Sequence, residues 1–261
     1  MKRAALVDNS ALLSVARRVD ELDVSGHTLT LTNFTVCEVK RGFLDRDPAP
    51  ETIEKAQFLC NCAWLLLPTF PSLLKGEMEE DMYSIWGHEP ADDKNRQLAD
   101  LRLCCDGKAK GLGKNHDQFY QQAKEQHRRF FEEVSQEESY KGTTLEEALR
   151  PDSVHAVAID VIAEQVAKLG FDADTEQHLV VAERVARLPL RSPAWAGLIR
   201  LVIWSNWHVQ HFGRIKSGLY FDAAWLRHSL MVDKVMTCDK NARRLGTLLY
   251  PEVDYPEVPT P

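Results

Sequence analysis

Asp222-Ala-Ala-Trp-Leu-Arg-His-Ser-Leu-Met-Val-Asp-Lys-Val-Met-Thr-Cys-Asp239, near the end of the chain, is the stretch from which the fold can be inferred. We expect a helix over residues 222–232, followed by a short strand over residues 234–238. In a parallel sheet, a crossover helix runs antiparallel to the strand that follows it. Asp222 and Asp239 should therefore lie at the carboxyl edge of the sheet, where ligands bind in open α/β sheets. Asp233, at the junction of helix and strand, should lie at the opposite edge.

The amino terminus shows the same arrangement of a strand followed by an acid. Ala4-Ala-Leu-Val7 is a short apolar run of the kind that buried parallel strands show, and it ends on Asp8. Asn9 or Ser10 can cap a helix over residues 11–18. Asp8 should therefore lie at the same edge as the two acids near the end of the chain.

A fourth acid follows the second expected strand. After a turn at Ser25-Gly26, Thr28-Leu-Thr-Leu-Thr32 alternates as a strand does. Thr32 or Asn33 can cap the next helix, over residues 34–41, which Gly42 ends. Glu38 lies about one turn into this helix, so it too can reach the carboxyl edge.

Four carboxylates in one cleft repel each other and require cations to stay ionised. A site made only of carboxylate oxygens favours a hard divalent ion, Mg²⁺ or Mn²⁺, over zinc. Such ions activate water and stabilise the charge of a phosphoryl group under attack. The residues thus predict a metal site for phosphoryl chemistry, with this ligand set: Asp8, Glu38, Asp222 and Asp239.

The order and spacing of these motifs resemble a PIN-domain nuclease. The resemblance rests on the strand that ends in Asp8-Asn-Ser10, on Thr35-Val-Cys-Glu-Val-Lys-Arg-Gly42, and on Asp222 placed one helix and one strand before Thr237-Cys-Asp239. It covers residues 1–70 and 218–250. The gap between Glu38 and Asp222 is far longer than the compact form of this family needs.

The resemblance implies a fold, an activity and partners. The fold would be α/β, a small parallel-sheet, doubly wound PIN-like domain with a long all-helical insertion. The activity would be hydrolysis of phosphodiester bonds by metal-activated water, with RNA favoured over DNA and with 5′-phosphate and 3′-hydroxyl product ends. Asn9, Ser10 and Thr237 would orient the acids or a metal-bound water. A regulatory protein partner is a further expectation, because small PIN proteins are frequently toxins held by a partner.

Composition is that of an ordinary globular protein. The 261 residues are 44% hydrophobic and 27% charged, with a net charge of −7 and a pI of about 5.7, so no global positive field attracts nucleic acid. The six cysteines lack the Cys-x-x-Cys spacing of zinc or redox sites and are expected as reduced thiols of a cytoplasmic protein. No segment reaches the ~20 apolar residues of a membrane span.

The chain divides into a core, an insertion and a tail. Residues 1–71 and 214–250 should form the PIN-like core, with a third strand over residues 64–68. Residues 72–213 show no convincing strand and should form a helical insertion, not a separate tethered domain. Its expected helices cover residues 72–86, 92–105, 117–135, 152–169, 175–187 and 193–212. The proline-rich tail, residues 251–261, should be extended and only partly ordered.

Basic and aromatic residues of the insertion could contact nucleic acid. The loop Gly107-Lys-Ala-Lys-Gly-Leu-Gly-Lys114 and the pair Arg128-Arg129 could bind phosphates, although a solvated loop is the plainer interpretation. Trp204 and Trp207 could stack on bases but fit a buried helix better. His208-x-x-His211 shares a helix face, and packing explains this pair better than metal binding.

Two other classes of function compete with the nuclease. Each acid could be an ordinary helix cap or surface residue, and the protein a non-catalytic PIN-like scaffold whose helical insertion binds a protein partner. The third possibility is a phosphatase or another phosphoryl-transfer enzyme on a doubly wound sheet. Asp8-Asn-Ser10 lacks the Asp-x-Asp motif of one such class, which disfavours it.

Overall fold

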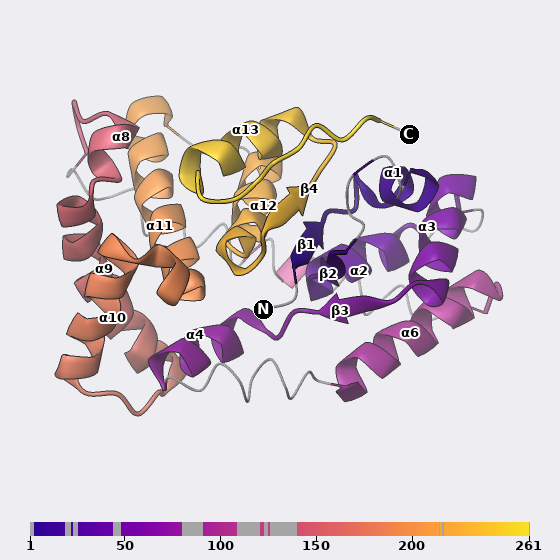
Figure 1. Cartoon of the computed structure of the whole chain (residues 1–261), viewed down its shortest axis with the longest axis horizontal. Helices are drawn as coiled ribbons and strands as arrows, with labels where there is room; N and C mark the ends of the chain where they lie inside the picture. The colour runs from indigo at the N-terminus through magenta and orange to yellow at the C-terminus, as the bar shows by residue number, and fades with distance from the viewer. Residues whose placement is uncertain are drawn as a thin grey trace.

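A small parallel sheet organises the chain, as the computed structural model shows (Figure 1). The structure describes residues 3–18, 22, 26–43, 48–79, 91–108, 121–122, 125, 140–213, 215 and 217–260. Within these residues the sheet has the order β3-β2-β1-β4, and every neighbouring pair is parallel. The strands are β1 (Ala4–Val7), β2 (Thr28–Leu31), β3 (Trp64–Leu66) and β4 (Lys234–Met236). The expected α/β class is confirmed, and all four strands lie where the sequence predicts them.

Side chains of the strands alternate between two hydrophobic clusters, one on each face of the sheet. Ala5 and Val7 of β1 belong to one cluster together with Met236 of β4. Leu6 of β1 and Val235 of β4 belong to the other cluster. Because both faces are covered, β1 is apolar throughout, as buried parallel strands are.

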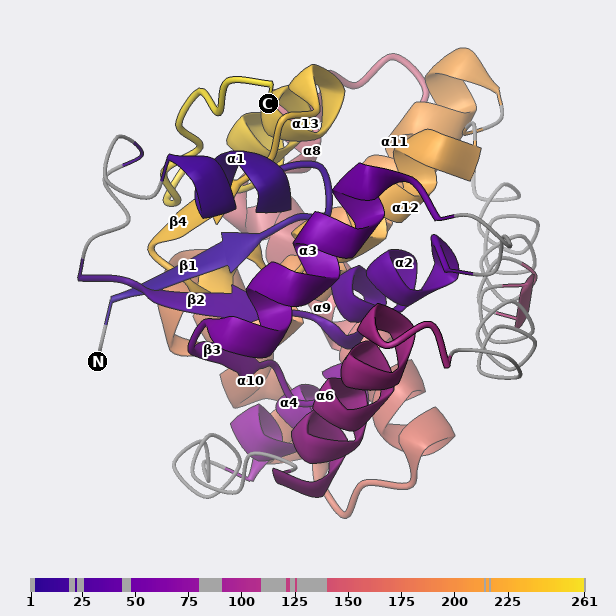
Figure 2. The same cartoon turned by 90° about the vertical axis from the view of Figure 1, so that its right-hand side faces the viewer.

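The first face carries the helices from the first part of the chain, which lie in front of the sheet in Figure 2. They are α1 (Leu12–Arg17), α2 (Asn33–Arg41), α3 (Pro50–Asn61) and α6 (Ala91–Cys105). Thr32 caps α2 through its hydroxyl, which accepts from the Thr35 N–H at 3.1 Å. The expected cap of α1 is wrong: its N-cap is Ala11, with no side-chain bond, because the Ser10 hydroxyl bonds elsewhere.

The second face carries helices from the middle and the end of the chain. They are α4 (Phe70–Met78), α8 (Leu145–Ala148), α9 (Pro151–Leu169), α10 (Thr175–Arg187), α11 (Pro193–Phe212), α12 (Ser217–Leu226) and α13 (Lys240–Leu249), with 3₁₀ turns η1 (Pro189–Arg191) and η2 (Ser229–Met231). Residues of α9, α10 and α11 share one hydrophobic cluster with Leu6 and Val235 of the sheet. The inserted helices therefore build one core with the sheet.

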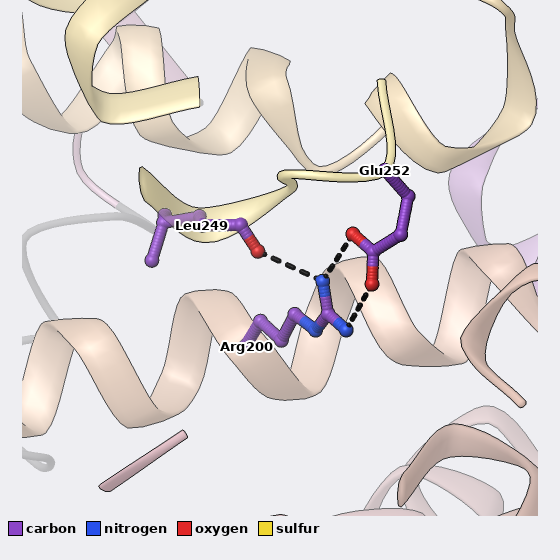
Figure 3. Close-up of polar contacts among 3 residues, drawn as sticks. All are labelled: Arg200, Leu249 and Glu252. Atoms are coloured by element: carbon purple, nitrogen blue, oxygen red, sulfur yellow. Dashed lines mark hydrogen bonds and ion pairs between the residues drawn. The ribbon is translucent and has the colours of Figure 1, made fainter. Parts of the chain in front are cut away.

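Helix α11 is held at its start and in its first half by polar contacts with distant segments. Its first N–H groups, those of Ala194 and Trp195, donate to the Glu77 carboxylate of α4 at 2.7 and 3.0 Å. Arg200 donates to both carboxylate oxygens of Glu252, at 2.8 and 2.7 Å, and to the Leu249 carbonyl at 2.9 Å (Figure 3). These contacts join α11 to α4, to the end of α13 and to the segment that follows it.

The helix boundaries agree with the sequence in most places. Helices expected at residues 152–169, 175–187 and 193–212 are observed within one residue. Helix α4 begins two residues earlier than expected, and the structure describes this region only as far as residue 79. The helix expected over residues 117–135 lies almost wholly outside the described residues.

The expectation of a poorly ordered tail is wrong. Val253 and Val258 are buried in the two hydrophobic clusters, and the Ser14 hydroxyl donates to the Pro259 carbonyl at 2.6 Å. The Val235 N–H donates to the Asp254 carbonyl at 2.9 Å, so the tail also bonds to β4. Among the described helices, none has both the length and the apolar character needed to cross a bilayer.

Candidate functional site

The candidate site lies at the carboxyl ends of β1 and β4, which are neighbours in the sheet although they lie far apart in the sequence. From β1 the chain adds β2 and β3 on one side, then returns to add β4 on the other side, so the strand order reverses here. Such a switch point leaves a crevice at the carboxyl edge, where open α/β sheets bind their ligands. Asp8 directly follows β1, and its N–H donates to the Met236 carbonyl of β4 at 2.9 Å. Asp8 is thus fixed at the switch point.

Hydroxyl groups from both strands hold the Asp8 carboxylate. Its Oδ2 accepts from the Ser10 hydroxyl at 2.5 Å, from the Ser10 N–H at 3.3 Å and from the Thr237 hydroxyl at 3.2 Å. The Ser10 hydroxyl also accepts from the Cys238 N–H at 3.0 Å. Ser10 and Thr237 therefore orient Asp8, one of the roles that the sequence suggests for them. All these bonds fall on Oδ2, so within the described residues Oδ1 has no hydrogen-bond donor.

Glu38 of α2 joins the site as the second acid. It is partly buried, and burial, followed by the negative charges of Asp8 and Asp222, raises its pKa to about 7. The positive charges of Lys55 and Arg41 act in the opposite direction. Glu38 is therefore near enough to both acids for each ionised carboxylate to make the next ionisation harder.

Asp222 is the third acid, and its local structure differs from the expectation. Helix α12 spans Ser217–Leu226, so Asp222 lies inside the helix and does not begin it. The helix also ends at Leu226, before the 3₁₀ turn η2, and does not continue to residue 232. Burial, followed by the charges of Asp239 and Asp8, raises the pKa of Asp222 to about 6. Asp222 therefore still lies at the carboxyl edge.

Asp239, the fourth acid, has an ordinary structural role as well. Its Oδ1 accepts from the N–H groups of Asn241 and Ala242 at 2.7 and 3.0 Å, which makes it the N-cap of α13. Its own N–H donates to the Thr237 hydroxyl at 3.1 Å. Thr237 thus connects Asp239 to Asp8. The plain cap interpretation of Asp239 is confirmed, with one carboxylate oxygen committed to it.

The four acids share electrostatic surroundings but not a ready-made coordination shell. In the part of the chain that the structure describes, no three Asp, Glu, His or Cys side chains are close enough together to hold one ion as they stand. The donor set, four carboxylates coupled through Glu38 and Asp222, nevertheless fits hard divalent ions better than soft ones.

Asp233 lies on the opposite edge, as the topology predicts. It directly precedes β4, and its carboxylate accepts from the N–H of Ala4, the first residue of β1, at 2.9 Å. Both strands begin here, so this is the amino edge of the sheet. The prediction that separates Asp233 from the other acids is confirmed.

Lys55 is a site residue that the sequence did not single out. It lies on α3, and its Nζ donates to the Asn9 side-chain oxygen at 3.0 Å. Its charge interacts with Asp8 and Glu38. In the sequence Lys55 resembles any lysine on a helix, because only the packing of α3 beside the end of β1 brings it to the acids.

The other candidates from the sequence lie elsewhere or outside the described residues. Trp204 is buried, and Trp207 donates its ring N–H to the Thr143 carbonyl at 2.8 Å, so both take part in packing. His208 and His211 each pack against the ring of Phe212. Of the loop 107–114 the structure describes Gly107 and Lys108 alone, and the pair at 128–129 lies outside it.

Comparison with known proteins adds no relative to this picture. No protein-family model, curated protein or solved structure matches the chain. The candidate site is therefore defined by its own residues, which lie at the switch point between β1 and β4: Asp8, Glu38, Asp222 and Asp239.

Proposed function

We propose that the protein is a PIN-like, metal-dependent nuclease that hydrolyses phosphodiester bonds, with RNA as the favoured substrate. The observation that carries the proposal is the mutual coupling of four acids at the switch point of a parallel sheet. Glu38 and Asp222 each have a raised pKa, partly because of the other acids. A fold gains no stability from crowding like charges, so a cationic ligand is the simplest reason for their arrangement.

Mg²⁺ or Mn²⁺ would be held by the carboxylates of Asp8, Glu38, Asp222 and Asp239. When bound, such ions supply an activated water and neutralise charge on the phosphoryl group under attack. Carboxylate oxygens are the donors that these ions prefer. Acids with raised pKa values suit cation binding, because a cation stabilises the ionised form that the crowding disfavours.

The protein's own groups set the orientation and protonation of the acids. Ser10 and Thr237 hold one oxygen of Asp8 and leave the other without a described donor. Capping by Asp239 directs one of its oxygens into α13. Glu38 must lose its proton to bind a cation, so its pKa of about 7 makes metal binding, and hence cleavage, weaker in acid.

The proposed substrate is a polyanion, which a protein of net charge −7 does not attract over long distance. Binding would then rest on local cations at the site and on the divalent ions themselves. A regulatory protein partner remains part of the proposal, as does a place in the cytoplasm.

The decisive experiment is a cleavage panel in Mg²⁺ and Mn²⁺ on single-stranded RNA, transfer RNA, single-stranded DNA and flap DNA. We expect metal-dependent cleavage of RNA by the wild type and none by Asp8→Asn. Asp233→Asn is the matched control, because it removes the same charge at the opposite edge of the sheet. Absence of cleavage by the wild type on every substrate would refute the nuclease.

A non-catalytic scaffold is the second candidate, and two observations favour it. The acids form no ready-made ion cluster among the described residues. Large apolar side chains are also exposed along α10 and η1: Leu179 by 46%, Leu188 by 50% and Leu190 by 60%. Such exposure suits a surface for a protein partner. Heat stabilisation by Mn²⁺ in the wild type, absent in Asp8→Asn, would favour the working metal site over the scaffold.

A further inference from the structure

Lys55 lies at the same edge of the sheet as the four acids, and its nearest hydrogen-bond partner is a neutral side chain. Lys55 is half-buried, and its Nζ donates to the neutral side-chain oxygen of Asn9 at 3.0 Å. Asn9 directly follows Asp8, so this bond places the ammonium beside the site. Among the described residues Lys55 makes no ion pair within 4.0 Å, although Asp8 and Glu38 are near enough to interact with its charge.

Lys40 shows how the same fold places a lysine that has only a structural role. It lies on α2, with a side chain only 1% exposed, and its Nζ meets the Asp100 carboxylate at 2.6 Å. That pair satisfies the buried ammonium with a dedicated opposite charge. The Lys55 ammonium instead interacts with the charges of several acids, Asp8 and Glu38 among them. An ammonium has three N–H donors, of which Asn9 takes one.

We propose that Lys55 binds the substrate phosphate at the carboxyl edge, using the N–H donors that Asn9 does not occupy. This inference rests on the proposed function and specifies how an acidic edge accepts a polyanion. A phosphodiester approaching four carboxylates is repelled unless cations face it, and ions held by the acids cover only part of its charge. An ammonium held by Asn9, and near enough to Asp8 and Glu38 to interact with their charges, would supply the missing contact at the reacting phosphate.

Burial, the largest influence, lowers the pKa of Lys55, and the charges of Asp8 and Glu38 counteract it. This balance is what a cation enclosed at the rim of an acidic site experiences. A pure counter-ion role makes a different prediction from phosphate binding. A counter-ion would compete with divalent ions for the acids without affecting the substrate, whereas a phosphate ligand would affect the substrate directly.

The test uses Lys55→Met, which keeps the length of the side chain, and Lys55→Arg, which keeps its charge. Lys168→Met, in an exposed pair with Glu164, is the matched control for loss of one positive charge. Melting temperatures establish that each variant is folded. Binding of a single-stranded RNA is measured in Ca²⁺ at several salt concentrations, cleavage in Mn²⁺, and Mn²⁺ binding by calorimetry without RNA.

We expect Lys55→Met to weaken RNA binding about 10- to 100-fold, the usual effect of losing a charged hydrogen bond. The slope of the logarithm of its RNA-binding constant against the logarithm of the salt concentration should become shallower by about 0.7, as for one lost phosphate contact to a single strand. Mn²⁺ binding should be unchanged or tighter, Lys55→Arg should recover most of the RNA binding, and Lys168→Met should match the wild type.

The outcomes separate this inference from the proposed function. Cleavage by the wild type together with unchanged RNA affinity and salt slope in Lys55→Met would overturn the inference and leave the nuclease in place. RNA binding that depends on Lys55 in a wild type that cleaves nothing would support the inference and refute the nuclease. A wild type that neither binds nor cleaves RNA would refute both.

Discussion

Two sets of charged side chains in this molecule are arranged by opposite principles. Around α11, ionisable side chains make specific bonds within the chain: Glu77 accepts from two N–H groups, and Arg200 forms a two-point pair with Glu252. At the carboxyl edge, Glu38 and Asp222 have acids as their main charged neighbours. The first arrangement is complete within the chain. In the function proposed above, the second is completed by a divalent cation, so we assign stability to the first arrangement and chemistry to the second.

The largest expected effect comes from removing one acid of the edge. Asp8→Asn should lower metal-dependent cleavage by about 100-fold or more, because it removes one carboxylate of the proposed divalent-ion site. Its free energy of unfolding in the absence of divalent ions should stay equal or rise, since repulsion is relieved.

Asp239 needs a more careful substitution than Asp8, because it also caps α13. Asp239→Asn retains a capping oxygen, so it should lose activity while its stability stays close to that of the wild type. Asp239→Ala should lose about 1 kcal/mol of stability in addition. Near wild-type cleavage rates in either Asn variant would remove that residue from the site.

The next largest effect is expected at Glu77, which bonds to the start of α11. Glu77→Ala should lower the free energy of unfolding by about 3 kcal/mol, because the N–H groups of Ala194 and Trp195 lose their acceptor inside the core. Urea unfolding measures this loss. Glu79→Ala is the control: this exposed acid pairs with Lys75 one turn away, and its loss should change stability by less than about 0.5 kcal/mol. Equal losses of stability in the two variants would show that the bonds from Glu77 to the start of α11 add no more stability than an exposed ion pair does.

The pH dependence of the free energy of unfolding should show an effect of intermediate size, which comes from the acids at the carboxyl edge. The folded protein holds the proton of Glu38 up to a pKa of about 7, against an ordinary value of 4.5. The native state therefore binds more protons than the unfolded state between these values, and stability falls as the pH rises through this window. For Glu38 the fall should be about 2 kcal/mol after allowing for solvent screening.

Saturating Mg²⁺ should reverse that trend, because ion binding requires the deprotonated acid. Thermal unfolding between pH 4 and pH 8, with and without Mg²⁺, is the measurement. Glu77, whose pKa burial raises to about 8, contributes to the same window, so the difference between wild type and Glu38→Gln isolates Glu38. Identical pH profiles for the two proteins would contradict the coupling of the edge acids.

The smallest effect is expected at the opposite edge of the sheet. Asp233→Ala should leave cleavage within about twofold of the wild type and cost at most about 1 kcal/mol, the bond to the Ala4 N–H. Parallel assays of Asp233→Ala and Asp8→Asn compare the two edges directly. Strong loss of cleavage in a folded Asp233→Ala variant would mean that the carboxyl edge is not where the chemistry occurs.

The sheet and two of its acids were predictable from the sequence because they depend on local patterns. An apolar run ending in Asp8 and another ending shortly before Asp239 mark buried parallel strands, and chain order then places both acids at one edge. Asp233 was assigned to the far edge by the same reasoning, and the structure agrees. The start of α12 was mistaken, because the apolar residues before Asp222 continue the helix without a break in pattern.

What the sequence did not reveal depends on packing between distant segments. Lys55 reaches Asn9 only because α3 crosses beside the end of β1. Glu77 reaches α11 across more than a hundred residues of chain. A long side chain with one charge has no periodicity that predicts its partner. Most of the fold was therefore foreseeable, whereas the way its charges are matched was not.

The tail gives the sheet a protection that its short strands would otherwise lack. β4 is an edge strand, and edge strands with free N–H and C=O groups can pair with other chains. Here the Val235 N–H donates to the Asp254 carbonyl, and the Asp254 N–H donates to the Asp233 carbonyl at 3.2 Å. Asp254 thus occupies backbone groups at the outer edge of β4 that would otherwise be open to another chain. A chain ending at Leu249 should aggregate through β4, even though every acid of the proposed site would still be present.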